Sequence, residues 1–142
     1  MAEINHVKGT TTPPLNTLSS LSPIQGKVSA IHMSAFFHLF LEDRQLQLAK
    51  IASSLLSPEK GSVIFGQHMG QPVKRLLGKK VNGVDVNMFF HSPESWTQMW
   101  TRDVFNGNNR VKVDTELVGV VRKGLPDPDE GEVWLKWSVT RL

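Results

Sequence analysis

The stretch Val28–Phe40 reads V-S-A-I-H-M-S-A-F-F-H-L-F, and the interpretation of the rest of the chain depends on it. Its first four residues, Val28–Ile31, form a short run that favours a β-strand. The run Phe36–Phe40, apolar except for His38, then precedes a strongly helical segment. The stretch therefore predicts a strand that ends where a helix begins. Because ligands of open α/β sheets bind outside the carboxyl ends of the strands, we expect any chemistry first at this junction.

A helix is predicted directly after the junction, from Glu42 to Leu56. One stripe of this helix is apolar and consists of Leu41, Leu48, Ile51, Ala52 and Leu55. The pair Ser57-Pro58 ends the helix, because the residue before a proline is pushed out of the α region. The apolar run Ser62–Gly66 follows and reads as a buried strand. Strand, helix and strand over this length predict one βαβ unit with parallel strands.

The segment Gln67–Asn87 is rich in glycine and basic residues and shows no sustained period. We interpret it as a long mobile loop, a kind of segment that in compact domains is usually functional or disordered. Its basic residues between Lys74 and Lys80 would attract an anionic partner, but we favour the interpretation as a solvated loop. The residues Gly66–Gly70 are the nearest approach to a phosphate-binding glycine loop. Their spacing differs from that fingerprint, and they do not lead into a predicted helix.

A second, shorter helix is predicted from Ser92, with Pro93 at its first position, and it should end before Asn106. The side chains of Trp96 and Trp100, together with the methionine between them, share one face of this helix. That face has two interpretations. It is either part of the hydrophobic core or a clamp for a bulky ligand.

The end of the chain has the two-residue period of half-buried strands. Apolar and polar residues alternate from Arg110 to Val121 and again from Glu132 to Arg141. A polar turn at residues 126–131 separates the two runs. They therefore predict an antiparallel hairpin.

The size and composition of the chain fit one soluble domain. It has 142 residues, of which 39% are hydrophobic and 20% charged, and a net charge of +3, too weak to indicate a nucleic-acid partner. There is no cysteine, no signal-peptide pattern and no membrane-length apolar run, so we expect a cytoplasmic protein without a membrane partner. Residues 1–27 read as a flexible lead-in, in which Leu15, Leu18 and Leu21 could form one helical turn against the core. Residues 28–142 form the predicted domain.

Several of these stretches together resemble a known family. They are Ser29–Phe40, Gln45–Ala49, Leu55–Pro58 with Gly61–Gly66, F-F-H-S-P-E-S-W at Phe89–Trp96, and the ending W-S-V-T-R-L. The family is that of the fungal class I S-adenosylmethionine-dependent methyltransferases, and the resemblance is to their carboxyl-terminal half. More narrowly, the chain resembles the group of meroterpenoid biosynthesis, which forms methyl esters or otherwise methylates polyketide-terpenoid intermediates. The resemblance extends over roughly residues 15 to 142.

The resemblance implies an α/β fold, namely a partial, half Rossmann-like methyltransferase sheet. In that sheet Val28–Ile31 matches the fourth strand, Ser62–Phe65 the fifth, and the final hairpin the last antiparallel pair. The family's first three strands, with their glycine-rich cofactor loop and acidic ribose-binding residue, have no counterpart in this sequence. We therefore expect the cofactor, S-adenosyl-L-methionine, to bind weakly or not at all to this chain alone.

The resemblance also implies where the site lies. Residues after the fourth strand line the sulfonium and the acceptor, which places Ser34 and Ala35 at the cofactor and His32 and Met33 at the substrate. Trp96 and Trp100 would add to the substrate site if their face is a clamp. His32 and His38 are the weak candidates for a catalytic base. For each of these residues taken alone, we favour a packing role. The four histidines His32, His38, His68 and His91 match no metal-ligand spacing, so no metal is predicted.

Three functions remain open. The first is methyl transfer to a meroterpenoid or polyketide-derived acceptor, for which a carboxylate acceptor would need no general base. The second is a non-catalytic remnant or interaction module that self-associates or pairs with another chain through the open edge of Val28–Ile31. The third is a small binding or isomerase-like domain with a pocket of phenylalanine and tryptophan.

Overall fold

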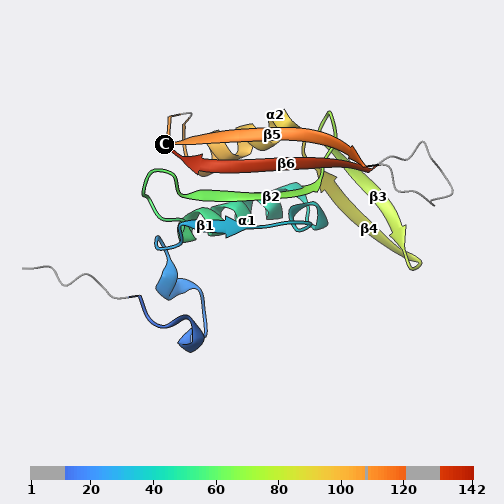
Figure 1. Ribbon diagram of the computed structural model, residues 1–142. Coiled ribbons are helices and arrows are strands. Elements are labelled where there is room, and N and C mark those ends of the chain that lie inside the picture. Colours follow the sequence, from blue (N-terminus) through green and yellow to red (C-terminus); the bar gives the residue numbers. More distant parts are fainter. Residues whose placement is uncertain (1–11, 108, 121–131) are drawn as a thin grey trace, which may run out of the picture.

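A computed structural model describes residues 12–107, 109–120 and 132–142 of the chain (Figure 1). Its main sheet contains β1 (Ala30–His32), β2 (Val63–Met69), β5 (Val111–Val120) and β6 (Glu132–Arg141), in the order β1-β2-β6-β5. β1 and β2 are parallel, and β6 is antiparallel to both β2 and β5. The predicted βαβ unit and the predicted final hairpin are therefore confirmed. The predicted turn at 126–131 lies outside the described residues.

The helices cover one face of this sheet (Figure 1). α1 (Glu42–Leu55) connects β1 to β2, and α2 (Pro93–Gln98) continues into the π-helical segment η4 (Met99–Val104). The Ser92 hydroxyl accepts the backbone N–H of Ser95 at 3.0 Å, so the predicted cap of the second helix is confirmed. None of the described helices has the length and apolar character needed to cross a membrane.

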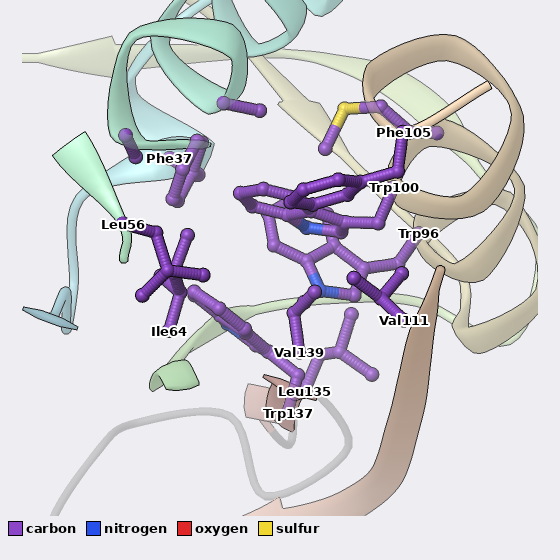
Figure 2. Close-up of a cluster of buried hydrophobic side chains, with 13 residues drawn as sticks. Phe37, Leu56, Ile64, Trp96, Trp100, Phe105, Val111, Leu135, Trp137 and Val139 are labelled. Carbon is purple, nitrogen blue, oxygen red and sulfur yellow. The ribbon is translucent and has the colours of Figure 1, made fainter. Parts of the chain in front are cut away.

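The core lies between these helices and the sheet, and aromatic rings dominate it (Figure 2). Leu135, Trp137 and Val139 alternate along β6 and all point toward the helices. The ring of Trp96 lies 4.9 Å from that of Trp137 and 5.0 Å from that of Phe37, which belongs to the short turn η3 (Phe37–Leu39). These rings connect α2, β6 and the segment after β1 in one layer.

The buried face of α1 differs from the predicted stripe. Ala52 of that stripe is buried as predicted, but Leu41 and Ile51 are 45% and 56% exposed. Gln45 and Ala49, which are outside the stripe, are buried instead. The prediction for Ile51 is wrong because the bulk of the core comes from aromatic rings on other elements, and small side chains on α1 leave room for them. The end of the helix at Leu55, before Ser57-Pro58, is confirmed.

The prediction of a loop at residues 67–87 is also wrong. β2 extends to Met69, and β3 (Arg75–Val81) and β4 (Val84–Phe90) form an antiparallel hairpin of their own. Asn82 and Gly83 make its turn, with φ of 51° and 79°. Two positive φ angles are what a two-residue hairpin turn requires, and Asn-Gly adopts them at low cost. The hairpin extends away from the main sheet in Figure 1.

The lead-in contains two short 3₁₀ turns, η1 (Leu15–Thr17) and η2 (Ser22–Ile24). Leu15 is 74% and Leu21 56% exposed, so these leucines do not lie against the core. Beyond them, the backbone N–H of Val28 donates to the carbonyl of Leu55 at 3.0 Å and attaches the chain to the end of α1. Residues 1–11 lie outside the described residues, and the domain boundary at residue 28 stays a prediction.

Candidate functional site

The chain leaves β1 at the carboxyl end of that strand and runs along the edge of β2, beside the middle of β2. The N–H of Met33 donates to the carbonyl of Phe65 at 2.9 Å, and the N–H of Ala35 donates to that of Gln67 at 2.8 Å. Ala35 has a φ of 52°, a left-handed conformation that turns the backbone away from the sheet. The predicted strand-to-helix junction is therefore present, with two hydrogen bonds that hold it against β2.

His32 and Ser34 lie together on the outer face of the sheet, which the helices do not cover. The Nε2 of His32 and the Oγ of Ser34 are 2.7 Å apart and share a hydrogen bond. The imidazole stacks on the ring of Phe65 with the centroids 5.0 Å apart. Both side chains border a shallow hollow of about 810 Å³ that also contacts outward-facing residues of β5 and β6. This is the part of the predicted site that the structure brings together.

The other predicted site residues lie elsewhere. Met33 is half-buried and packs against the core, and Ala35 is exposed beyond the junction. Trp96 and Trp100 are fully buried, so in this conformation neither indole can contact a ligand. Their shared face is core, the first of its two interpretations.

His38 is also separated from the junction, because it lies on the helix side of the sheet and is only 7% exposed. Burial lowers its pKa, although the negative charge of Glu132 acts in the opposite direction. The structure therefore does not place the two base candidates His32 and His38 at one site.

Two further histidines are buried near Trp96. The indole N–H of Trp137 donates to Nδ1 of His68 at 3.0 Å, so the proton of the neutral imidazole is on Nε2. Burial lowers the pKa of His68 to about 3, with a further contribution from His38 and His91. Burial also lowers the pKa of His91 to about 4. Within the described residues, no three histidine or carboxylate side chains are grouped so that they could hold a metal ion.

Gly66 and Gly70, which bound the segment nearest to a phosphate-binding loop, are both held in or beside the main sheet. Gly66 lies within β2, and the N–H of Gly70 donates to the carbonyl of Val133 at 2.9 Å. Amides that are engaged in this way are not free to bind a phosphate.

The cofactor candidates fit S-adenosylmethionine only in part. The Ser34 hydroxyl already forms a hydrogen bond with the His32 ring, and the Ala35 backbone N–H already donates to the carbonyl of Gln67. Across the described residues, no glycine-rich turn connects a strand to a helix in the way that cofactor-binding α/β sheets use. These residues can form one wall of such a site, but they do not form the site by themselves.

A second cavity, which the sequence did not predict, lies on the helix side of the sheet. It has a volume of about 630 Å³ and is bordered by the start of α1, the β3–β4 hairpin and the α2–η4 segment. No local sequence signal marks it, because its wall forms only when the hairpin folds back beside the helices.

Fungal methyltransferases are similar to the chain in sequence, although no protein-family model matches it. The O-methyltransferase phiE of a fungal species is 35% identical over 81 residues, which cover 56% of this chain and 26% of that protein. The Asnovolin E/Chermesin D methyltransferase nvfJ of Aspergillus novofumigatus is 33% identical over 99 residues, or 67% of this chain and 31% of that protein. The methyltransferase adrK of Penicillium rubens is 28% identical, over 66% of this chain and 33% of that protein. The chain thus spans about a third or less of these relatives.

The fold is similar to that of a solved structure described as an S-adenosylmethionine dependent methyltransferase from Listeria monocytogenes. The TM-score is 0.52, at 10% sequence identity, over 84% of this chain and 64% of the other. At this identity the likeness concerns the fold alone. It confirms the predicted α/β class and the partial Rossmann-like sheet. The chain is therefore related in sequence to fungal methyltransferases and has a partial class I S-adenosylmethionine-dependent methyltransferase fold.

Proposed function

We propose that this chain forms the acceptor side of a methyltransferase of fungal secondary metabolism. The enzyme transfers a methyl group from S-adenosylmethionine to an oxygen atom, preferably a carboxylate, of a terpenoid or polyketide-derived molecule. One observation carries the proposal: residues 33–35 leave β1 at its carboxyl end, where its parallel pairing with β2 stops, and open α/β sheets bind their ligands at such strand ends. The names of the relatives support oxygen as the acceptor atom, since one of them is an O-methyltransferase.

The chemistry requires little from the side chains. Bound cofactor supplies an electrophilic methyl group, and the protein contributes alignment and the exclusion of water. A carboxylate acceptor is already a nucleophile, so the absence of His38 from the junction is no obstacle. The exposed pair His32 and Ser34 offers hydrogen-bonding atoms 2.7 Å apart that can orient an acceptor oxygen.

The proposal includes weak cofactor binding by the chain alone. Because the described residues form only one wall of a cofactor site, titration calorimetry of the purified chain with S-adenosylmethionine should show no saturable heat at micromolar concentrations. A micromolar Kd would contradict this part of the proposal.

A chimaera tests the methyl transfer itself. Residues 28–142 replace the matching segment of the nvfJ protein, and transfer of radioactive methyl groups to asnovolin E is measured. The chimaera should retain activity, and His32→Ala should lower the rate by about tenfold or more, as loss of a positioning contact does. Lys60→Ala, an exposed change in the turn before β2 that does not border the hollow, is the matched control and should have no effect. A folded chimaera that binds the cofactor but transfers no methyl group would overturn the proposal.

A second candidate function rests on the open edge of β1. Ser29 and Met33 direct their hydrogen bonds to β2, so the alternating residues Ala30 and His32 direct their backbone groups to the other side. No described strand pairs with that side. Such an edge can accept a strand of a second copy or of another protein.

Light scattering distinguishes this candidate. An edge-paired module should be a dimer or larger at micromolar concentration, and Ala30→Lys should shift it toward the monomer, because charges on an edge oppose pairing. Ser20→Lys, which is exposed and lies outside the strand, serves as the control. A strictly monomeric wild-type chain would rule out self-pairing through this edge.

A further inference from the structure

The turn of the β3–β4 hairpin presents an apolar pair of side chains to solvent. Val81 and Val84 flank the Asn82-Gly83 turn and lie opposite each other in the register, so their side chains share one face of the hairpin. Val81 is 44% and Val84 62% exposed. Figure 1 shows this turn at the free end of the hairpin, away from α1 and α2.

The cavity on the helix side of the sheet offers a second apolar surface, at the base of the same hairpin. It has a volume of about 630 Å³ and is open to solvent. Its apolar lining includes Leu46 of α1, Leu76 and Phe89 of the hairpin, and Met99 of η4. Apolar side chains that entered this cavity would be stabilised there, because their nonpolar surface and that of the cavity would both be removed from water.

The valines of one chain lie too far from the cavity of that same chain to enter it. Leu76 borders the cavity, and Val81 lies five residues farther along β3. At about 3.4 Å per residue, the two positions are separated by roughly 17 Å along the strand. The strands are paired over their whole length, up to Val81 and Val84, which keeps the turn away from the base of its own hairpin. Within this protein the two surfaces can therefore meet only between two copies of the chain.

The rim of the cavity has an excess of negative charge. Its lining contains three carboxylates and two cations. Lys74 pairs with Glu42, and Arg102 pairs with Asp103, each at 2.8 Å. Asp43 is exposed and forms no ion pair with any described residue. The remaining carboxylate at the rim is therefore available to a cation from outside.

The hairpin carries the opposite excess of charge. Residues 75–85 contain one arginine, two lysines and one aspartate, so three positive charges and one negative charge leave a net charge of +2. Lys80 directly precedes Val81, is exposed, and forms no ion pair with any residue that the structure describes. The apolar pair thus has an unpaired cation beside it, and the apolar cavity has the unpaired Asp43. The two surfaces are complementary in charge as well as in polarity.

Two hairpins that lie side by side and point in opposite directions would bring both pairs of surfaces together. The turn of each hairpin then lies at the base of the other, where the cavity opens. A two-fold axis generates every contact twice, so each contribution to the affinity counts double. This arrangement does not involve the edge of β1.

We propose that the chain forms a two-fold dimer through its β3–β4 hairpin. Val81 and Val84 of one copy enter the cavity of the other copy, and Lys80 of one copy forms an ion pair with Asp43 of the other. The proposal does not rest on methyl transfer, because the dimer needs neither a cofactor nor an acceptor.

Sedimentation equilibrium of the purified full-length chain tests the dimer. We expect a species of twice the chain mass at micromolar concentration. Val84→Ser should weaken the association by about fivefold or more, because less apolar surface is buried at two equivalent places. Val73→Ser is the matched control and should have no effect, since Val73 is 74% exposed and lies outside both the hairpin strands and the cavity.

Two results of this measurement would overturn the proposal. One is a chain that stays monomeric throughout the micromolar range. The other is a dimer that Ala30→Lys dissociates and Val84→Ser does not, since such a dimer would pair through β1.

An exchange of charges locates the contact. Lys80→Asp and Asp43→Lys should each raise the Kd of the dimer by about fivefold or more, because an attraction becomes a repulsion at two equivalent places. The double variant should return the Kd to within about threefold of the wild type, since its charges attract again. Lys60→Asp and Glu59→Lys, both exposed in the turn before β2, are the matched controls and should have no effect. A double variant that keeps the native circular dichroism spectrum but does not recover the dimer would contradict the assignment, and none of these results bears on methyl transfer.

Discussion

The carbonyl oxygen of Met33 lies against the α-carbon of Gly66, and a Cβ added at Gly66 would come within 1.9 Å of that oxygen. The neighbour is backbone held by hydrogen bonds to β2, so it cannot move aside as a flexible side chain would. Gly66→Ala should therefore lower the free energy of unfolding by at least about 2 kcal/mol, measured by urea denaturation. Gly119→Ala has no atom within 4 Å of the added Cβ and should change it by less than about 0.5 kcal/mol. Similar effects of both substitutions would contradict this close approach.

Gln45 should contribute strongly to stability. Its buried side-chain amide donates to the carbonyls of Phe40 and Phe89, at 2.9 and 2.8 Å, and so attaches α1 to the turn before it and to the hairpin. Gln45→Met keeps the volume but leaves both carbonyls without this donor, and should cost about 1–3 kcal/mol in thermal or urea unfolding. Gln47→Met, two residues away on the exposed side, should cost almost nothing. If Gln45→Met left the free energy of unfolding unchanged, water would have to replace the lost amide donor.

The buried histidines should make the fold sensitive to acid. His38, His68 and His91 have lowered pKa values in the folded state, whereas in the unfolded chain they titrate near the ordinary 6.5. The unfolded state therefore binds more protons below pH 6.5. The stabilisation is complete above that pH and is lost as the pH falls toward 4. Urea titrations at a series of pH values should show an uptake of about two to three protons on unfolding in this window.

Single substitutions identify which histidines take up these protons on unfolding. His91→Asn should lower the pH dependence by about one proton. A free energy of unfolding that does not vary between pH 7 and pH 4.5 would show that these histidines are not buried as neutral groups.

The two sheets should differ in local stability. β6 is paired on both sides, whereas β3 and β4 pair only with each other, and Leu76, Val81 and Val84 of that hairpin are exposed. An isolated two-stranded hairpin is marginal in water. Hydrogen exchange measured by mass spectrometry should therefore be at least about 100-fold faster at 75–90 than at 135–139. Equal protection would mean that the hairpin unfolds only together with the main sheet.

The elements that the sequence predicts correctly have strong local signals. β5 and β6 alternate apolar and polar residues, and α2 begins with a serine cap before a proline, so neighbouring residues alone suffice to predict them. β3 and β4 have lysine, glycine and asparagine on exposed positions, which hides the alternation. The Asn82-Gly83 pair was the available signal for this hairpin.

The candidate site was predictable only in part. The sequence places His32 and Ser34 at a strand end, but that their side chains share a hydrogen bond is seen only in the structure. The burial of His38 and the tryptophans depends on side chains brought from β4 and β6, which no local pattern contains. The cavity beside His91 likewise needs three elements to meet, so it could be found only in the folded structure.

The position of β6 in the sheet has a consequence for synthesis on the ribosome. β2 and β5 do not touch each other through hydrogen bonds; each pairs with β6, which is the last of the four strands to be made. Until residues 132–141 have emerged, β2 can pair only with β1, and β5 has no partner strand in the main sheet. The nascent chain must therefore pass through a stage with unpaired strand edges and an unfilled core, a state that invites aggregation or chaperone binding.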